Sequence, residues 1–135
     1  MNKLIAILLT CVLITSVAGA DSARDVLEAS GAKGGLVVHI GCGDAESSVS
    51  TAGLRPNDSF LVHGLSRIGD HVAASRQYIK SICLHGPVSV DLWQGQALPY
   101  GDNMVNLLVI EDGSQIPEAE ILRTLVPQGA AMARR

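Results

Sequence analysis

The chain has 135 residues and a formal net charge of −3 at neutral pH, and this length suits a single domain. The acidic balance and an aromatic content of 3% argue against a nucleic-acid partner, which needs clustered cations or stacking rings. Three cysteines are too few for a disulfide framework, and no Cys/His spacing fits a zinc site.

The N-terminal segment has the pattern of an export signal. Lys3 precedes an apolar run over 4–14, and Ala-Gly-Ala at 18–20 is a small-x-small cleavage pattern. The run is shorter than the ~20 residues of a spanning helix. An uncleaved anchor is therefore the weaker alternative, and a lipoprotein modified at Cys11 is weaker still. We expect an exported, periplasmic or secreted protein with no stable membrane span after cleavage.

Residues 1–20 are thus predicted as a signal peptide, and residues 21–135 as one domain in which helices and strands alternate. The expected order is a helix over 23–30, a strand over 36–40, a short helix over 45–54, a strand over 60–65, a helix over 69–83, strands over 88–93 and 105–112, a helix from Pro117, and the start of a fifth strand at the end of the sequence. This alternation predicts an α/β fold with a Rossmann-like, doubly wound, mostly parallel sheet of about five strands.

Apolar spacing also predicts which helix faces are buried. The positions expected in the core are Ile68, Val72, Ile79 and Ile82 for the helix over 69–83, and Ala119, Leu122 and Leu125 for the last helix. An open parallel sheet binds ligands at the carboxyl ends of its strands. The informative segments are therefore 41–46, 66–68, 94–100 and 111–114.

The first of these segments is a glycine-rich turn in the stretch GGLVVHIGCGDAESS. Gly41 and Gly43 fit the first two glycines of a dinucleotide fingerprint, but Glu46 stands at the third position, where a carboxylate would meet the pyrophosphate. No Gly-Lys-Ser/Thr follows, which excludes a phosphate loop. A nucleophilic Cys42 lacks an evident base, because His39 lies within the strand. A thiol-based redox protein ranks last, since there is no Cys-x-x-Cys.

The order of motifs resembles the class I S-adenosylmethionine-dependent methyltransferases, of the type 11-like group. The stretches that carry the resemblance are VHIGCGD, FLVHGLS, SVDLWQGQALPYGDNMVNLLVIED and EILRTLVPQGAAM. They extend from about Gly34 to Met132. The combination is especially similar to an exported bacterial branch in which such a domain precedes a pyrroloquinoline-quinone-like β-propeller. The resemblance implies S-adenosylmethionine as cofactor and an unknown methyl acceptor, with a β-propeller as a partner domain in longer relatives.

The resemblance also implies which residues contact the cofactor. Acidic residues near the glycine turn suit a sulfonium cation. Ser66 stands where the family usually carries an acidic residue that accepts both ribose hydroxyls, and a neutral partner weakens that bond. Gln94 matches the position that receives the adenine amino group. The candidate cofactor-binding residues are Gly41, Cys42, Gly43, Ala45, Ser66, Gln94, Gly95 and Glu111.

Other positions leave alternatives open. Glu111 and Asp112 follow the fourth strand and are interpreted either as groups that orient a nucleophile or act as a base, or, preferentially, as an exposed, solvated acidic pair. His39 is read as a satisfied core histidine rather than a catalytic one. A complete domain of this family adds an antiparallel hairpin at the sheet edge, so the domain is expected to be truncated. The rival to an enzyme is an inactive exported scaffold or binding domain that keeps the fold only.

Overall fold

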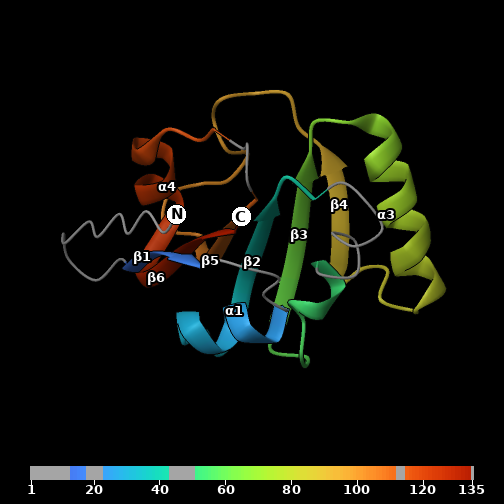
Figure 1. Cartoon of the computed structure of the whole chain (residues 1–135), viewed down its shortest axis with the longest axis horizontal. Helices are drawn as coiled ribbons and strands as arrows, with labels where there is room; N and C mark the ends of the chain where they lie inside the picture. Colours follow the sequence, from blue (N-terminus) through green and yellow to red (C-terminus); the bar gives the residue numbers. More distant parts are fainter. Residues whose placement is uncertain (1–12, 18–22, 43–50, 112–114, 135) are drawn as a thin grey trace.

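The computed structural model describes residues 13–17, 23–42, 51–111 and 115–134 (Figure 1). Its elements in chain order are β1 (Leu13–Val17), α1 (Ala23–Ser30), β2 (Gly35–Ile40), β3 (Phe60–Ser66), α3 (Gly69–Ser81), β4 (Val88–Leu92), β5 (Val105–Ile110), α4 (Glu118–Thr124) and β6 (Leu125–Arg134). The alternation of strands and helices predicted from the sequence is confirmed.

The strands form one sheet in the order β1-β6-β5-β2-β3-β4. Every pair of neighbours is parallel. From β2 the chain builds outward through β3 to β4, then returns to the other side of β2 for β5 and β6. The strand order therefore reverses between β2 and β5, and such a switch point is where open α/β sheets bind ligands.

The central strand β2 is buried on both faces, as its apolar run predicts. Val37 and Val38 point to opposite faces, and both are fully buried. Val37 belongs to the core under α1 and α3, together with Val26 and Ile79. The opposite face has its own core, described below. The sheet is therefore covered on both sides, as expected of a doubly wound fold.

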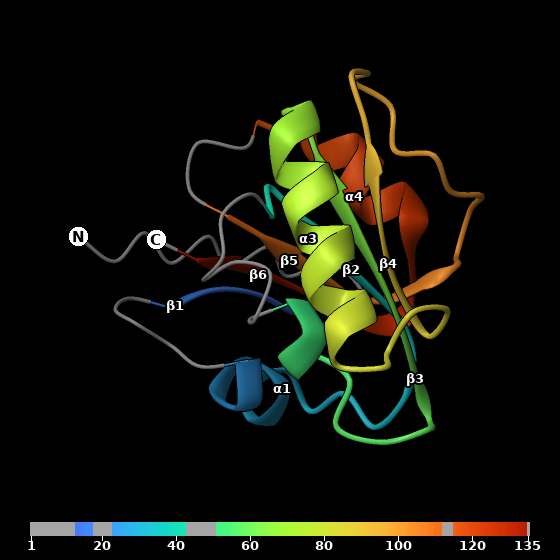
Figure 2. The ribbon, with the colours of Figure 1, turned by 90° about the vertical axis from the view of Figure 1, so that its right-hand side faces the viewer.

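The second core lies between the sheet, α4 and the segment over 93–104. It contains Val38 from β2, Ile121 from α4, and Trp93 and Leu98 from the segment. Figure 2 shows α3 on one side of β4, and α4 with the 93–104 segment on the other. This segment replaces a helix as the cover over β2 and β3.

Two strands differ from the sequence prediction. The fifth strand does not merely start at the end of the sequence: β6 spans Leu125–Arg134. Its outer edge pairs in parallel with β1, from Leu13↔Ala130 to Val17↔Arg134. The pairing gives the edge backbone groups of β6 hydrogen-bonding partners within the chain. β1 lies inside the segment predicted as an export signal, so cleavage after Ala20, which remains a prediction, would remove it.

The predicted buried face of α3 is confirmed at two of its four positions. Val72 and Ile79 are buried, but Ile68 is 51% and Ile82 39% exposed. Both flank the helix, as its N-cap and C-cap residues, and thus lie beyond the turns that pack on the sheet. The helix also ends at Ser81 rather than at residue 83.

The predicted face of α4 was wrong. Ile121 and Thr124 are buried, whereas Ala119 is exposed and Leu122 is half-buried. The reason is that α4 ends at Thr124, so the third expected position, Leu125, belongs to β6 and is buried as a strand residue. No helix among the described residues is long and apolar enough to cross a membrane.

Candidate functional site

Backbone hydrogen bonds join the carboxyl ends of four neighbouring strands. The Gly41 amide donates to the Leu65 carbonyl over 2.8 Å, and the Trp93 amide donates to the Ser66 carbonyl over 2.8 Å. The Glu111 amide donates to the Ile40 carbonyl over 2.9 Å. The segments that the sequence analysis singled out therefore lie along one edge of the sheet. The candidates Gly43 and Ala45, together with Asp112, lie outside the described residues.

Gly41 makes the turn at the end of β2. Its φ is +87°, in the left-handed region that glycine adopts without steric strain, and it is exposed. A ligand can therefore approach the backbone here, at the strand next to the switch point. This conformation supports the interpretation of Gly41 as part of a binding turn.

Cys42 turns its side chain into the core instead of the site. It is fully buried and packs with the residues under α1 and α3. Burial raises the pKa of the Cys42 thiol to about 12, which keeps it protonated and unreactive at neutral pH. The assignment of Cys42 as a cofactor-binding residue stays a prediction, and with the side chain in the core the contact would come from its main chain.

Ser66 is placed at the end of β3 as expected, but its hydroxyl serves its own turn. The Ile68 amide donates to the Ser66 Oγ over 3.2 Å, and Ser66 is almost fully buried. The Ser66 hydroxyl also donates to the Ile68 carbonyl over 3.5 Å, which leaves it one lone pair. A neutral hydrogen bond accepted there is weaker than the charged bond of a carboxylate.

Gln94 and Gly95 follow β4 and are tied to the loop after β3. The side-chain Nε2 of Gln94 donates to the Arg67 carbonyl over 3.1 Å, and Arg67 Nη2 donates to the Gly95 carbonyl over 3.0 Å. The Arg67 guanidinium lies 4.3 Å from the centre of the Trp93 ring, a cation–π arrangement. With its nitrogen engaged, the Gln94 side chain keeps its carbonyl oxygen as an acceptor.

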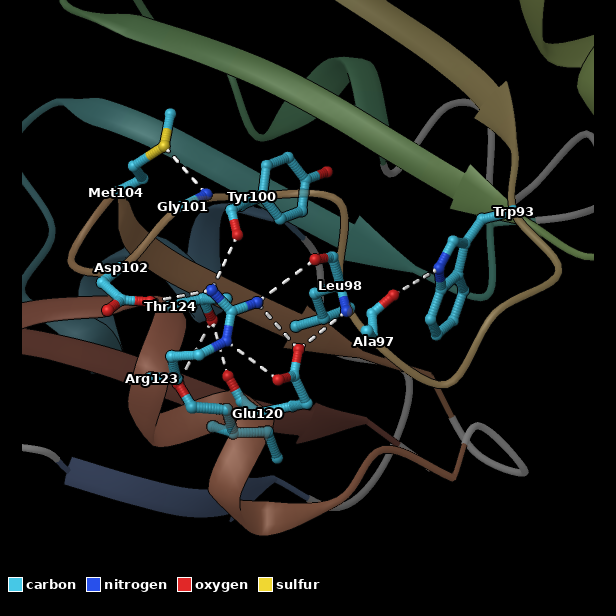
Figure 3. A network of polar contacts seen from close by, with 11 residues as sticks. Trp93, Ala97, Leu98, Tyr100, Gly101, Asp102, Met104, Glu120, Arg123 and Thr124 are labelled. Carbon is cyan, nitrogen blue, oxygen red and sulfur yellow. Dashed lines mark hydrogen bonds and ion pairs between the residues drawn. The ribbon is translucent and has the colours of Figure 1, made fainter.

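A salt-bridge cluster missed by the sequence analysis holds the segment over 93–104 against α4 (Figure 3). Arg123 donates to Glu120 through two nitrogens and also to Asp102 and to the Tyr100 and Leu98 carbonyls. Glu120 in turn accepts the Leu98 amide over 2.8 Å. Only the Glu-x-x-Arg spacing on one helix face could have indicated part of this cluster.

The same segment is held from the side of the sheet by Tyr100. Its hydroxyl lies 2.6 Å from His63 Nδ1, and His63 Nε2 lies 2.7 Å from Asp91 Oδ2. Arg76 from α3 completes this cluster by donating to Asp91 Oδ1 over 2.6 Å. The hydrogen bond from His63, followed by that from Arg76, lowers the pKa of Asp91. The segment that carries Gln94 and Gly95 is therefore fixed at both of its faces.

Glu111 is hydrogen-bonded to a buried histidine, so the reading of a solvated acidic pair is wrong for this residue. His39 is fully buried; its Nε2 lies 2.5 Å from Glu111 Oε1 and its Nδ1 lies 2.5 Å from Thr51 Oγ1. The interpretation of His39 as a satisfied core histidine is confirmed. Thr51 was missed, since nothing in its local sequence indicates a partner twelve residues away.

A cavity of about 650 Å³ lies elsewhere, between α1 and the start of β3. Leu27, Lys33 and Phe60 are among the residues that line it. It opens at the amino-terminal edge of the sheet, opposite the strand ends described above. We place the candidate site at the carboxyl edge, because ligands of open parallel sheets bind there.

No protein-family model matches the sequence, and no curated protein sequence matches it significantly. Solved structures do match its fold. A putative S-adenosyl-L-methionine-dependent methyltransferase from Methanococcus maripaludis superposes with a TM-score of 0.69 at 18% identity, covering 83% of this chain and 53% of that one. Geranyl diphosphate C-methyltransferase from Streptomyces coelicolor, in a complex with S-adenosyl-L-homocysteine, gives 0.61 at 15% identity, covering 77% and 41%.

A third similar structure shows that this fold alone does not identify a reaction. The [4+2]-cyclase SpnF matches with a TM-score of 0.65 at 24% identity, over 79% of this chain and 41% of its own. One fold thus carries different reactions among these structures, and activity has to be argued from the site. The chain spans about half the length of these proteins. It has the Rossmann-like fold of the class I S-adenosylmethionine-dependent methyltransferases.

Proposed function

We propose that this chain binds S-adenosylmethionine and belongs to a methyltransferase, with an acceptor not yet identified. The observation that carries the proposal is Gly41, which makes a left-handed turn at the end of the central strand, beside the switch point of the sheet. Ser66 ends β3, and Gln94 and Glu111 follow β4 and β5 along the same edge. These side chains are neutral or acidic, which suits a cofactor that carries a sulfonium and no phosphate.

The residues around this edge divide the binding of the cofactor among them. The turn at Gly41, with Gly43 and Ala45 from the sequence motif, would receive the methionine and ribose portions. Gln94 and Gly95 would hold the adenine, and Glu111 would face the cationic end. When bound, the cofactor supplies an electrophilic methyl group. The protein's part is to fix positions and exclude water, which the anchored segment over 93–104 favours.

We propose further that the protein is exported and related to the branch with a β-propeller. Support comes from the N-terminal charge and apolar pattern and from the similarity of the motifs, VHIGCGD above all. Cleavage after Ala20 would separate β1 from the sheet. Sequencing the N-terminus of the protein recovered from the periplasm or the medium, after expression with its own leader, tests this proposal.

Calorimetric titration with S-adenosylhomocysteine tests the binding function. We expect micromolar binding that is lost in Gly41→Arg, because an arginine side chain would fill the turn and strain its backbone. Gly31→Ala is the matched control: Gly31 also has a positive φ, of +70°, but it lies after α1, and an added Cβ meets nothing within 4 Å. The absence of heat from a folded wild-type sample would overturn the proposal.

A further inference from the structure

The cavity of about 650 Å³ at the amino-terminal edge of the sheet has an apolar interior. Figure 1 shows α1 beside the starts of β2 and β3, which is where the cavity lies. Leu27 from α1 and Phe60 from β3 are the most buried residues that line it, at 9% and 5% exposed. Ala32 and Pro56 add further apolar surface. Small-molecule sites typically enclose ~300–1,000 Å³ and are lined mainly by apolar side chains, and this cavity has both properties.

Hydrogen bonds hold the two loops beside the cavity in place. After α1, the Ser30 hydroxyl donates to the Leu27 carbonyl over 2.9 Å and accepts from the Ala32 amide over 3.2 Å. Before β3, the Ser59 amide donates to Asn57 Oδ1 over 2.8 Å. The walls are therefore fixed before any ligand arrives, and a preformed site loses less free energy in ordering itself on binding.

The polar groups on the rim of the cavity favour an anion. Lys33 lines it and forms no ion pair with another residue of the described part of the chain. Asn57 Oδ1 is engaged by the Ser59 amide, which leaves the side-chain Nδ2 as a donor. Arg24 and Glu28 also line the cavity, but they pair with each other over 3.0 Å, so their charges offset. The cavity thus offers one positive charge and several N–H donors beside an apolar interior.

We propose that this cavity binds a small amphipathic organic acid. Its apolar group would lie between Leu27 and Phe60, and its carboxylate would accept hydrogen bonds from Lys33 and Asn57. The inference goes beyond the proposed function and does not rest on it. The cavity opens at the edge of the sheet opposite Gly41, so this ligand and the cofactor can be bound at the same time.

Heteronuclear NMR titration of the full ¹⁵N-labelled chain tests the proposal with two probes, 4-phenylbutyrate and the neutral 4-phenylbutanol. The probes share the apolar group and differ in the anion. We expect saturable shifts confined to the amides of 27–33 and 53–60, with a dissociation constant of about 1 mM for the acid, because it has few atoms. The alcohol should bind about two- to fivefold more weakly, the range that corresponds to one exposed ion pair.

A substitution at Lys33 tests the recognition of the anion. Lys33→Gln should reduce the affinity for the acid to that for the alcohol and leave the alcohol unaffected, because only the acid contacts the ammonium group. Lys80→Gln is the matched control: Lys80 is also an exposed lysine, but it lies on α3, away from the cavity. A preference for the acid that persists in Lys33→Gln would overturn the assigned role of Lys33.

A substitution that fills the cavity tests its location. Ala32→Phe should abolish the binding of both probes, because the added ring would occupy the apolar interior. Ala29→Phe is the control, since Ala29 is exposed on α1 and does not line the cavity. Circular dichroism melts establish that each variant is folded, and if Ala32→Phe is not, the comparison of Lys33→Gln with the wild type decides. Undiminished binding in a folded Ala32→Phe would overturn the proposal.

Two further results would contradict the inference while leaving the proposed function intact. One is the absence of saturable shifts at several times the expected dissociation constant. The other is displacement of 4-phenylbutyrate by S-adenosylhomocysteine, which would place the probe at the carboxyl edge. Conversely, saturable binding in the cavity of a chain that does not bind S-adenosylhomocysteine would support this inference and overturn the proposed function.

Discussion

Arg123 and Glu120 form a two-bonded ion pair on one face of α4. Arg123 Nε lies 2.8 Å from Oε1 of Glu120, and Nη2 lies 2.9 Å from Oε2. The same two side chains contact the backbone at Leu98, and Arg123 also contacts the Tyr100 carbonyl. The pair thus connects a short helix to the segment that carries the candidate adenine-binding residues.

This pair predicts an acid-sensitive contribution to stability. Arg123, followed by the Leu98 amide, lowers the pKa of Glu120 from 4.5 to about 2. A depressed folded-state pKa means that the contribution is fully present above the unfolded value and is lost as the pH falls from 4.5 toward 2. The free energy of unfolding, measured with urea across this window, should fall with pH in the wild type and fall less in Glu120→Gln. An equal dependence of the unfolding free energy on pH in the two proteins would contradict the prediction.

The ion pair of Arg123 and Glu120 also predicts that Arg123→Gln weakens ligand binding without unfolding the protein. The variant should keep the sheet but loosen the segment over 93–104, because Asp102, Glu120 and two backbone carbonyls lose their shared donor. We expect weaker binding of S-adenosylhomocysteine and faster amide hydrogen exchange confined to this segment. Arg24→Gln, which removes the exposed ion pair of α1 with Glu28, is the control and should leave both measurements unchanged.

The two described cysteines should differ in reactivity. Cys42 is buried with its pKa raised to about 12, whereas Cys83 is exposed. A thiol-alkylating reagent at pH 8 should therefore modify Cys83 rapidly and leave Cys42 unmodified in the native protein, with both modified in guanidinium. Peptide mapping by mass spectrometry distinguishes the sites. Rapid native alkylation of Cys42 would show that its environment is open.

Close packing between Gly64 and Cys42 predicts a coupled pair of substitutions. A Cβ on Gly64 would lie 2.8 Å from Cys42 Sγ and 3.1 Å from a Val90 methyl. Gly64→Ala should therefore destabilise the fold by about 1–3 kcal/mol through overpacking. Cys42→Ala removes the sulfur, so the double variant should be more stable than the sum of the single changes predicts. Strict additivity in denaturant titrations would argue that the two sites do not share this space.

Pairing of β1 with β6 predicts an effect of the N-terminal residues on solution behaviour. A chain that begins at Asp21 leaves the outer edge of β6, with Ala130, Ala131 and Met132, without its neighbouring strand. We expect a lower melting temperature and concentration-dependent association, because an open strand edge can pair with another chain. Size-exclusion chromatography coupled to light scattering measures this association. Identical behaviour of the two forms would show that β1 contributes nothing to the sheet.

The sequence by itself determined the order of the elements from α1 onward and pointed to the edge of the sheet that carries the candidate site. Continuous apolar runs such as Leu36–Ile40 identify buried strands, and the parallel arrangement brings the residues after them to one edge. Positions such as Gly41, Ser66 and Gln94 could therefore be singled out without coordinates. Local spacing carries this information because strands and helices repeat over two and 3.6 residues.

Tertiary structure alone decided the contacts between residues far apart in the chain. His39 and Glu111 meet because β2 and β5 are neighbours, and Thr51 contacts His39 from the other side of its ring. No periodicity predicts such a meeting. The same holds for the contacts of Arg123 with the 93–104 segment and for the pairing of β1 with β6. Burial on α4 was likewise set by where the helix ends against the sheet, a property of packing that the apolar pattern does not contain.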